Sequence, residues 1–326
     1  MSPLTRQLVR WGVIALVWAG AIYLLNRTLL SQIDWGAVAT HGYTPAERFG
    51  VAAFVGCFLV AMALRALRFH LLMNALQPLP ARDCVTIHLW GFAIGAITPL
   101  RMGEGVRLIW ARRRGIPTGE AVVVWVVERM ADFATLLAIV GTAGAAVLLQ
   151  RMIPGIGPGL IGLALAGLVA LAAVALVVLV ALARHSHRLQ RHLPAPLARQ
   201  VDTLGRGAGK LVRAHAMGRF ALLTALIWTA MASAFWLGYS GFFDGLGPAG
   251  ALLLLGLVNL SFLLAFLPGH VLGYHAVAAA VLAGFGASPE QAAISAIVIH
   301  AVTISVVLTL GGVARLARLG LRLDQD

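Results

Sequence analysis

The stretch TPLRMGEGVR, residues 98–107, places three charged side chains in a chain that is otherwise strongly apolar. Arg101 and Arg107 carry guanidinium groups, whose planar fork of donors matches a phosphate or a carboxylate, and Glu104 adds a carboxylate between them. A proline and two glycines accompany these residues, so the chain is expected to turn here. The chemistry that this pattern favours is the binding of an ionic group in a protected polar cavity.

A second charged set, in the motif VVERMADF, lies inside an apolar stretch. Glu128 and Asp132 are four residues apart and share one helix face, while Arg129 points about 100° away from Glu128. Each charge costs roughly 2.5–3.5 kcal/mol at the bilayer centre, so these residues are expected to have partners or to face water. We predict that Glu128 and Asp132 pair with Arg101 or Arg107. The set is a structural ion-pair network or a site for an ionic headgroup, and the two interpretations are compatible.

Two histidines in the motif LPGHVLGYHAV complete the polar candidates, His270 and His275. A lone histidine in an apolar segment is commonly a satisfied core residue, whereas His275, which follows a broken helix, is placed to hydrogen-bond a phosphate. The two are five residues apart and no cysteine or carboxylate cluster joins them, so neither a metal nor a cofactor is expected.

Membrane-spanning helices must position these residues. The chain is 60% hydrophobic and 11% charged, whereas soluble domains average about 25% charged residues. Uncharged runs reach the roughly 20 residues that a spanning helix needs. We expect an all-α polytopic membrane protein with a single domain, 1–326, and free thiols at Cys57 and Cys84. Six full spans are predicted at about 8–30, 48–72, 119–149, 159–183, 220–243 and 291–313.

Two further apolar segments do not fit simple spans. The first, 84–99, is short and runs into the charged stretch, and the second, 251–285, is interrupted by Pro268 and Gly269. Backbone groups freed at mid-depth must be covered by protein or water. We predict two re-entrant helical hairpins, at about 84–114 and 251–285, that enter from opposite faces. Transporters of this design hold substrate near the midplane, at the broken helices.

The net charge of +13 is explained by membrane topology rather than by nucleic acid, since cytoplasmic loops of membrane proteins collect Arg and Lys. With the N-terminus inside, nearly all basic residues face the cytoplasm, Arg65 and Arg68 among them. Only Arg27, Arg48 and Arg151 fall on the other side. Both termini are therefore predicted to be cytoplasmic, and the first hairpin to open from that side.

One basic amphipathic helix is predicted at 195–213, within the cytoplasmic segment 184–219. Its apolar residues recur every three or four positions, at Leu197, Val201, Leu204, Ala208 and Leu211. This helix either rests on the inner leaflet, where its basic residues attract anionic headgroups, or packs on the helix bundle.

Four motifs together resemble a known family. RALRFHLLMNAL (65–76), ITPLRMGEGVRLIWARRRGIPTGEA (97–121), VVERMADF (126–133) and LPGHVLGYHA (267–276) are similar to the lysylphosphatidylglycerol synthase transmembrane-region family of flippase-like membrane proteins. The resemblance implies a bacterial inner-membrane protein that translocates or handles a lipid. Family members are associated with aminoacylated phospholipids, hopanoids and polyprenyl-linked sugars.

The chain departs from the family pattern at the second hairpin. The family tends to read Pro-Gly-Gly-x-Gly followed by a glutamate, whereas here His270 replaces the second glycine and His275 stands where the acid is expected. A soluble aminoacyl-transferase domain is not seen after residue 313, so lysyl transfer to a lipid is not expected.

The leading functional prediction is a lipid translocase that moves or presents a phospholipid, hopanoid or polyprenyl-linked lipid through a polar cavity between the hairpins. Its partners would be membrane lipids with an anionic or zwitterionic headgroup. The alternatives are an accessory subunit that binds a lipid-linked substrate for a partner transferase, and a proton-coupled small-solute transporter. An enzyme is not expected, because nucleophile–base pairs and nucleotide-binding glycine loops are not seen. The predicted substrate-binding residues are Arg101, Glu104, Arg107, Glu128, Arg129, Asp132, His270 and His275.

Overall fold

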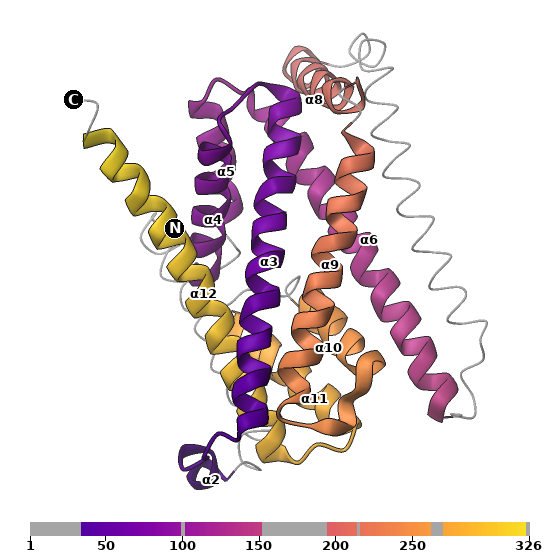
Figure 1. Cartoon of the computed structure of the whole chain (residues 1–326). Helices are drawn as coiled ribbons and strands as arrows, with labels where there is room; N and C mark the ends of the chain where they lie inside the picture. The colour runs from indigo at the N-terminus through magenta and orange to yellow at the C-terminus, as the bar shows by residue number, and fades with distance from the viewer. Residues whose placement is uncertain (1–33, 99–101, 152–193, 214–215, 262–269, 324–326) are drawn as a thin grey trace, which may run out of the picture.

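The computed structural model describes residues 34–98, 102–151, 194–213, 216–261 and 270–323, and the regular elements of these residues are all helical. Figure 1 shows them as a bundle of long helices accompanied by two pairs of shorter helices. The elements are α2 (Trp35–Ala39), α3 (Pro45–Leu76), α4 (Ala81–Ile97), α5 (Gly103–Arg113), α6 (Thr118–Arg151), α8 (Ala195–Arg213), α9 (Met217–Ser240), η4 (Asp244–Leu246), α10 (Gly247–Ser261), α11 (Val271–Gly284) and α12 (Pro289–Leu323).

Five segments among the described residues are long and apolar enough to cross a membrane: Pro45–Leu76, Thr118–Val147, Met217–Ser240, Asp244–Ser261 and Pro289–Ala317. Four of them coincide with predicted spans, which confirms an all-helical multi-pass membrane protein. The fifth combines η4 with α10 and falls largely within the predicted second hairpin. The predicted spans 8–30 and 159–183 lie outside the described residues, so the number of crossings stays a prediction.

Two helix pairs occupy opposite halves of the molecule. In Figure 1, α4 and α5 lie in the half that contains α8, whereas α10 and α11 lie in the half that contains α2. Each pair is in mutual contact. The pairs coincide with the predicted hairpins, 84–114 and 251–285, but parts of their turns, 99–101 and 262–269, lie outside the described residues. That each pair enters and leaves a membrane on one side stays a prediction.

Small residues bring the backbones of α4 and α5 together. A Cβ on Gly103 would clash with the carbonyl oxygen of Gly91, and a Cβ on Gly91 would meet the Cγ of Arg107 at 2.6 Å. Glycine permits this approach because it has no side chain to separate the helices. The contact also lays the stem of Arg107 across α4, which directs its guanidinium toward α6.

The start of α3 is set by a capping box. The Thr44 hydroxyl accepts a hydrogen bond from the Glu47 amide at 3.2 Å, and the Glu47 carboxylate accepts one from the Thr44 amide at 2.7 Å. Pro45 follows at the first helical position, where its missing N–H costs nothing. This end of α3 therefore begins at a defined residue, and the helix then runs for 32 residues through the bundle.

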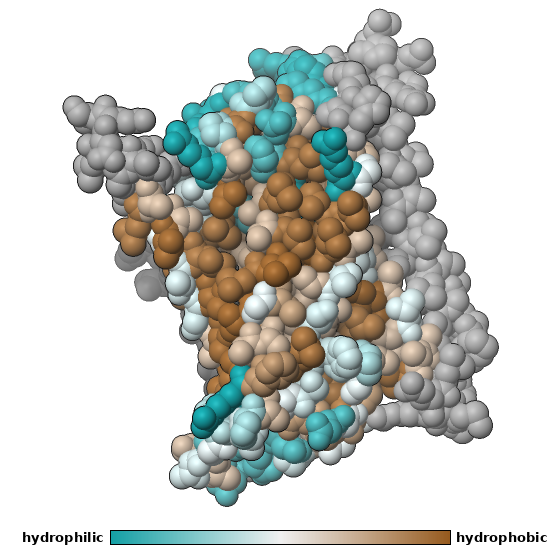
Figure 2. Space-filling view, in the orientation of Figure 1, coloured by the Kyte–Doolittle hydropathy of each residue, from teal (hydrophilic) through white to brown (hydrophobic). Residues whose placement is uncertain are grey.

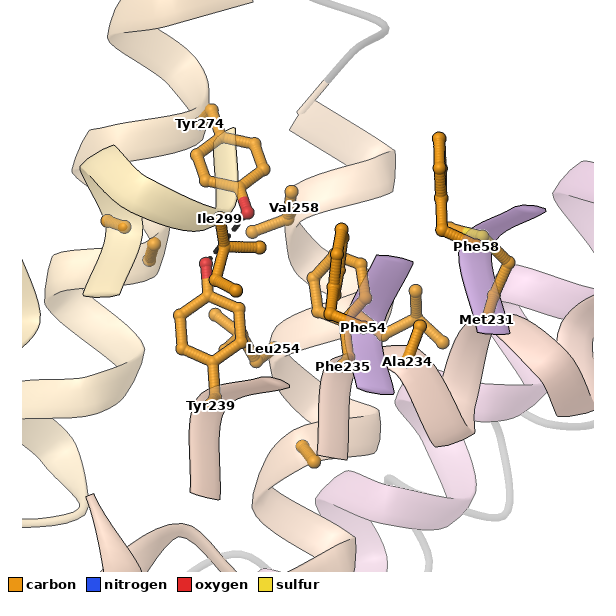
Figure 3. Close-up of a cluster of buried hydrophobic side chains, with 14 of the residues drawn as sticks. Phe54, Phe58, Met231, Ala234, Phe235, Tyr239, Leu254, Val258, Tyr274 and Ile299 are labelled. Carbon is orange, nitrogen blue, oxygen red and sulfur yellow. Dashed lines mark hydrogen bonds between the residues drawn. The ribbon is translucent and has the colours of Figure 1, made fainter. Parts of the chain in front are cut away.

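Two apolar clusters hold the helices together. The larger one lies in the α2 half and joins α3, α9, α10, α11 and α12. Figure 3 shows its centre, where Phe54 and Phe235 pack beside Ala234 and where the hydroxyls of Tyr239 and Tyr274 meet. The smaller cluster lies in the α8 half, between α3, α4, α6 and α8. The face in Figure 2 carries a belt of apolar side chains between hydrophilic ends, as a membrane requires.

Helix α8 packs on the bundle through the face that the sequence predicts. Ala208 and Leu211 are fully buried, and α8 contacts α6 and α3. The Lys210 ammonium lies 2.7 Å from the buried carboxylate of Glu120 on α6. Of the two interpretations of this segment, packing on the bundle therefore accounts for its buried face. Attraction of anionic headgroups by its basic residues stays a prediction.

Candidate functional site

A buried ion-pair network connects four helices. Arg107 of α5 donates one hydrogen bond to Glu104 at 2.8 Å and another to Glu128 of α6 at 2.6 Å. Its guanidinium also lies over the ring of Phe69, 4.2 Å from the ring centroid, which adds a cation–π contact. The predicted pairing of the first hairpin with Glu128 is therefore present, whereas the described ion-pair partners of Asp132 lie on α3 and α6.

Arg68 of α3 holds the other acidic residue of α6. Its two terminal nitrogens donate to the two carboxylate oxygens of Asp132, at 2.8 and 2.9 Å, in the bidentate geometry that favours arginine over lysine. Arg68 also donates to the Thr224 hydroxyl of α9 at 3.0 Å. The Trp228 indole donates to Asp132 at 3.3 Å. This carboxylate thus ties α3, α6 and α9 together.

The remaining two arginines of the network make longer contacts. Arg129 lies 3.3 Å from Asp132 and 3.9 Å from Glu104, and its side chain is 23% exposed. Arg65 lies 3.6 Å from Asp132, with its guanidinium over the ring of Trp228. These two arginines form the looser edge of the network.

The sequence analysis was wrong about two of these residues. It assigned Arg65 and Arg68 to the cytoplasmic surface, whereas the structure buries both, Arg68 to 1% exposure. The reason is that α3 continues as a helix to Leu76, so both residues stay inside the bundle. Their spacing of three places them on one helix face, which is the signal that a pairing interpretation would have used. Arg101 lies outside the described residues.

The network is not neutral among the described residues. Four guanidinium groups face three carboxylates. Burial of ions is favourable only when opposite charges and hydrogen bonds offset the lost hydration. The surplus of one positive charge therefore favours an anion beside the network. The carboxylates are Glu104, Glu128 and Asp132.

A partly open cavity of about 180 Å³ lies beside the network. The inner ends of both helix pairs border it: Gly95 and Thr98 come from the end of α4, Asn259 from the end of α10, and His270 from the start of α11. Its charged lining consists of Arg65, Glu104, Arg129 and Asp132. Its uncharged polar lining consists of Thr98, Asn259, His270, Tyr274, His300 and Thr303.

His270 occupies a backbone conformation that glycine favours. Its φ of 54° and ψ of 27° are left-handed, and it is the one residue other than glycine with positive φ among those described. The chain therefore keeps a left-handed turn where the resembling family tends to carry glycine. The ring is buried against Gly273, and its Nε2 lies 2.9 Å from the Ser261 hydroxyl of α10. His270 thus joins α10 to α11 at the cavity wall.

His275 has a different environment. Its Nδ1 donates to the carbonyl of Val271 in the same helix at 2.6 Å, and its ring lies edge-on to that of His300, with centroids 5.0 Å apart. His275 is not among the described residues that line the cavity. A substrate contact by His275 stays a prediction. The sequence analysis noted neither Tyr274 nor Asn259, because uncharged side chains in apolar helices give no signal of their own.

The arrangement is suited to holding a charged group away from water. The arginines supply donors, Glu104 and Asp132 offset their charge, and the rest of the wall is apolar or uncharged. Such a site inside a bundle of apolar helices is typical of multi-pass membrane proteins that handle a polar or ionic ligand within the membrane.

The family follows from comparison with known proteins. The model of the lysylphosphatidylglycerol synthase TM region family matches residues 9–311, so the chain belongs to this family. The resemblance seen in the sequence motifs is therefore confirmed, and it relates the chain to lipid handling in membranes. Neither the curated proteins nor the solved structures contain a significant match.

Proposed function

We propose that this protein is a lipid translocase whose cavity receives the headgroup while the acyl or prenyl chains stay in the surrounding bilayer. The observation that carries the proposal is that the inner ends of both helix pairs border one cavity lined by arginine. The face in Figure 2 carries apolar side chains between its hydrophilic ends. A headgroup that entered from either side would meet the same two arginines, Arg65 and Arg129, as alternating access requires.

The arginines have two different roles in this proposal. Arg68 and Arg107 make short hydrogen bonds to buried carboxylates and serve as the scaffold. Arg129 contacts the lipid phosphate, because it lines the cavity, is the most exposed of the four arginines, and makes only longer ion pairs. A phosphate offers it stronger, charge-assisted hydrogen bonds than its resting partners do. Arg65 supports the same phosphate from α3.

The proposed setting is the bacterial inner membrane, with the α8 end in the cytoplasm. Basic residues gather at this end, for example Arg112, Arg113 and Arg199. The positive-inside tendency then orients the chain. Binding and movement of the lipid, rather than its chemical conversion, is the proposed activity.

A vesicle assay tests this function. The purified protein is reconstituted in liposomes that contain a fluorescent anionic phospholipid, and the lipid that moves between leaflets is measured by quenching from outside. Arg129→Gln is expected to reduce the rate at least about tenfold, since it removes the charge that holds the phosphate. The matched control is Arg206→Gln, which changes an exposed arginine on α8 that pairs with Asp202. Equal rates in Arg129→Gln and the unaltered protein would refute the proposal.

A further inference from the structure

The uncharged part of the cavity wall carries a repeated arrangement. Thr98, Asn259 and Thr303 come from α4, α10 and α12, and all three line the cavity. Each donates a hydrogen bond to the carbonyl four residues earlier in its own helix, at 2.6, 2.8 and 2.7 Å respectively. Three helices thus present the same local geometry to one space.

This geometry leaves defined groups for a ligand. A threonine hydroxyl that has donated its hydrogen keeps an oxygen that only accepts. Asn259 keeps its side-chain oxygen as an acceptor and the second hydrogen of its amide as a donor. A ligand that satisfies this wall must therefore both donate and accept hydrogen bonds. Hydroxyl groups do both, whereas an ammonium group only donates.

Charge leads to the same ligand class. The described network carries one surplus positive charge, and the two carboxylates in the cavity wall, Glu104 and Asp132, already pair with arginine. A ligand with a single negative charge is therefore favoured, and an added ammonium is repelled. A phosphodiester carries a single negative charge at neutral pH.

We propose that the cavity selects a phosphodiester lipid whose headgroup bears uncharged hydroxyl groups, such as a glycerol or a sugar, over one that bears an amine. The phosphate lies against Arg129, and the hydroxyls lie against Asn259 and Thr303 on the opposite wall. This inference rests on the proposed function, since it concerns the same cavity, and adds which headgroup that cavity prefers.

Four lipids with matched acyl chains separate the contributions of the phosphate, the hydroxyl groups and the amine to binding. Phosphatidylglycerol has the phosphate and the hydroxyls, phosphatidylethanol has the phosphate alone, phosphatidylethanolamine adds an amine, and a diacylglycerol glucoside has hydroxyls without phosphate. Each is titrated into the detergent-solubilised protein, and the apparent Kd is measured by native mass spectrometry. Phosphatidylglycerol is expected to bind about fivefold or more tighter than phosphatidylethanol, the effect of one net hydrogen bond. Phosphatidylethanolamine is expected to bind more weakly than both.

Substitutions in the uncharged wall test whether it causes the preference for hydroxyl-bearing headgroups. Asn259→Leu and Thr303→Val each keep the side-chain size but remove the polar group. Each is expected to bring the affinity for phosphatidylglycerol closer to that for phosphatidylethanol, whose own Kd should not change. Thr142→Val is the matched control, because Thr142 makes the same hydrogen bond within α6 at 2.7 Å but is exposed and does not line the cavity.

The outcomes distinguish this inference from the proposed function. Tighter binding of phosphatidylethanolamine, or an unchanged ratio of phosphatidylglycerol to phosphatidylethanol affinity in both wall variants, overturns the headgroup preference. If Arg129→Gln still weakens every phosphodiester in that case, the proposed function stands without it. If none of the four lipids binds in a manner that depends on Arg129, the proposed function itself fails. Soluble glycerophosphoglycerol that competes as well as the lipid would show that the site takes a free phosphodiester and not a lipid.

Discussion

The two sides of the cavity satisfy their polar groups in different ways. On the side of α3, α5 and α6, arginines and carboxylates pair between helices. Arg68 of α3 bonds to Asp132 of α6, and Arg107 of α5 bonds to Glu128 of α6. On the side of α10 and α12, Asn259 and Thr303 bond within their own helices. Charged groups in an apolar bundle need a partner of opposite sign, and the shortest such contacts here, Arg68 with Asp132 and Arg107 with Glu128, join different helices. Uncharged groups are satisfied locally, which leaves atoms free to face a ligand. The charged side therefore holds the helices together and, in the proposed function, offers Arg129 to a phosphate, while the uncharged side offers hydrogen-bonding groups to the rest of the headgroup.

The largest expected effect concerns which side of the membrane each half faces. In a chain with both Cys57 and Cys84 replaced by alanine, single cysteines at the exposed positions Thr40 in the α2 half and Arg199 in the α8 half are treated with an impermeant maleimide. In intact spheroplasts, position 40 is expected to react and position 199 to react only after permeabilisation. The reverse pattern would invert the proposed orientation.

Removal of one ionic partner is expected to have the next largest effect. Asp132→Ala leaves Arg68 buried without its bidentate partner, and breaking a buried pair costs about 3–5 kcal/mol. Little monodisperse protein should survive in size-exclusion chromatography after mild heating. Asp202→Ala, which breaks an exposed pair with Arg206 on α8, is the control and should behave as the unaltered protein. Equal heat resistance of the two variants would show that the network does not hold the fold.

Besides the contact of His270 with Ser261, a second polar contact near the uncharged side joins two helices. The hydroxyls of Tyr239 on α9 and Tyr274 on α11 lie 2.7 Å apart in the apolar cluster (Figure 3). Tyr239→Phe or Tyr274→Phe alone leaves the other hydroxyl unsatisfied, at a cost of about 1–3 kcal/mol. The double substitution is expected to cost less than the two single changes together. Additive shifts in the unfolding temperature would contradict this coupling.

The smallest expected effect is at the left-handed residue. His270→Ala keeps the strained backbone and loses the contact with Ser261, whereas His270→Gly loses the same contact but relieves the backbone. The glycine variant should therefore be more stable than the alanine variant by about 1 kcal/mol. Thermal unfolding of the two purified variants measures the difference. An alanine variant as stable as the glycine variant would mean that this backbone strain is absent in the membrane.

Long apolar helices and charge pairs were predictable from sequence, and the neutral wall was not. The runs that became α3, α6, α9 and α12 are unmistakable, because few charges interrupt them. The pairing of a hairpin arginine with Glu128 followed from the helical spacing of Glu128 and Asp132 and from the cost of an unpaired charge in an apolar helix. Arg68 was missed because a tally of basic residues along the chain assigns each to the nearest loop, whereas the helix carries it into the bundle. Asn259 and Thr303 have neither charge nor periodicity to single them out, and only the approach of α10 and α12 to one cavity does so.

The contact between Gly91 and Gly103 has a mechanical consequence. Because the two backbones touch, α4 cannot slide or roll against α5. The two helices therefore form one rigid unit that includes Arg107. A rigid-body movement of this unit requires changes of backbone conformation in the connections before α4 and after α5. Pro78 and Pro80 precede α4, and Gly115, with a φ of 83°, follows α5. In the proposed translocation, a movement of this unit relative to the cavity arginines on α3 and α6 would bend the chain at these two short connections.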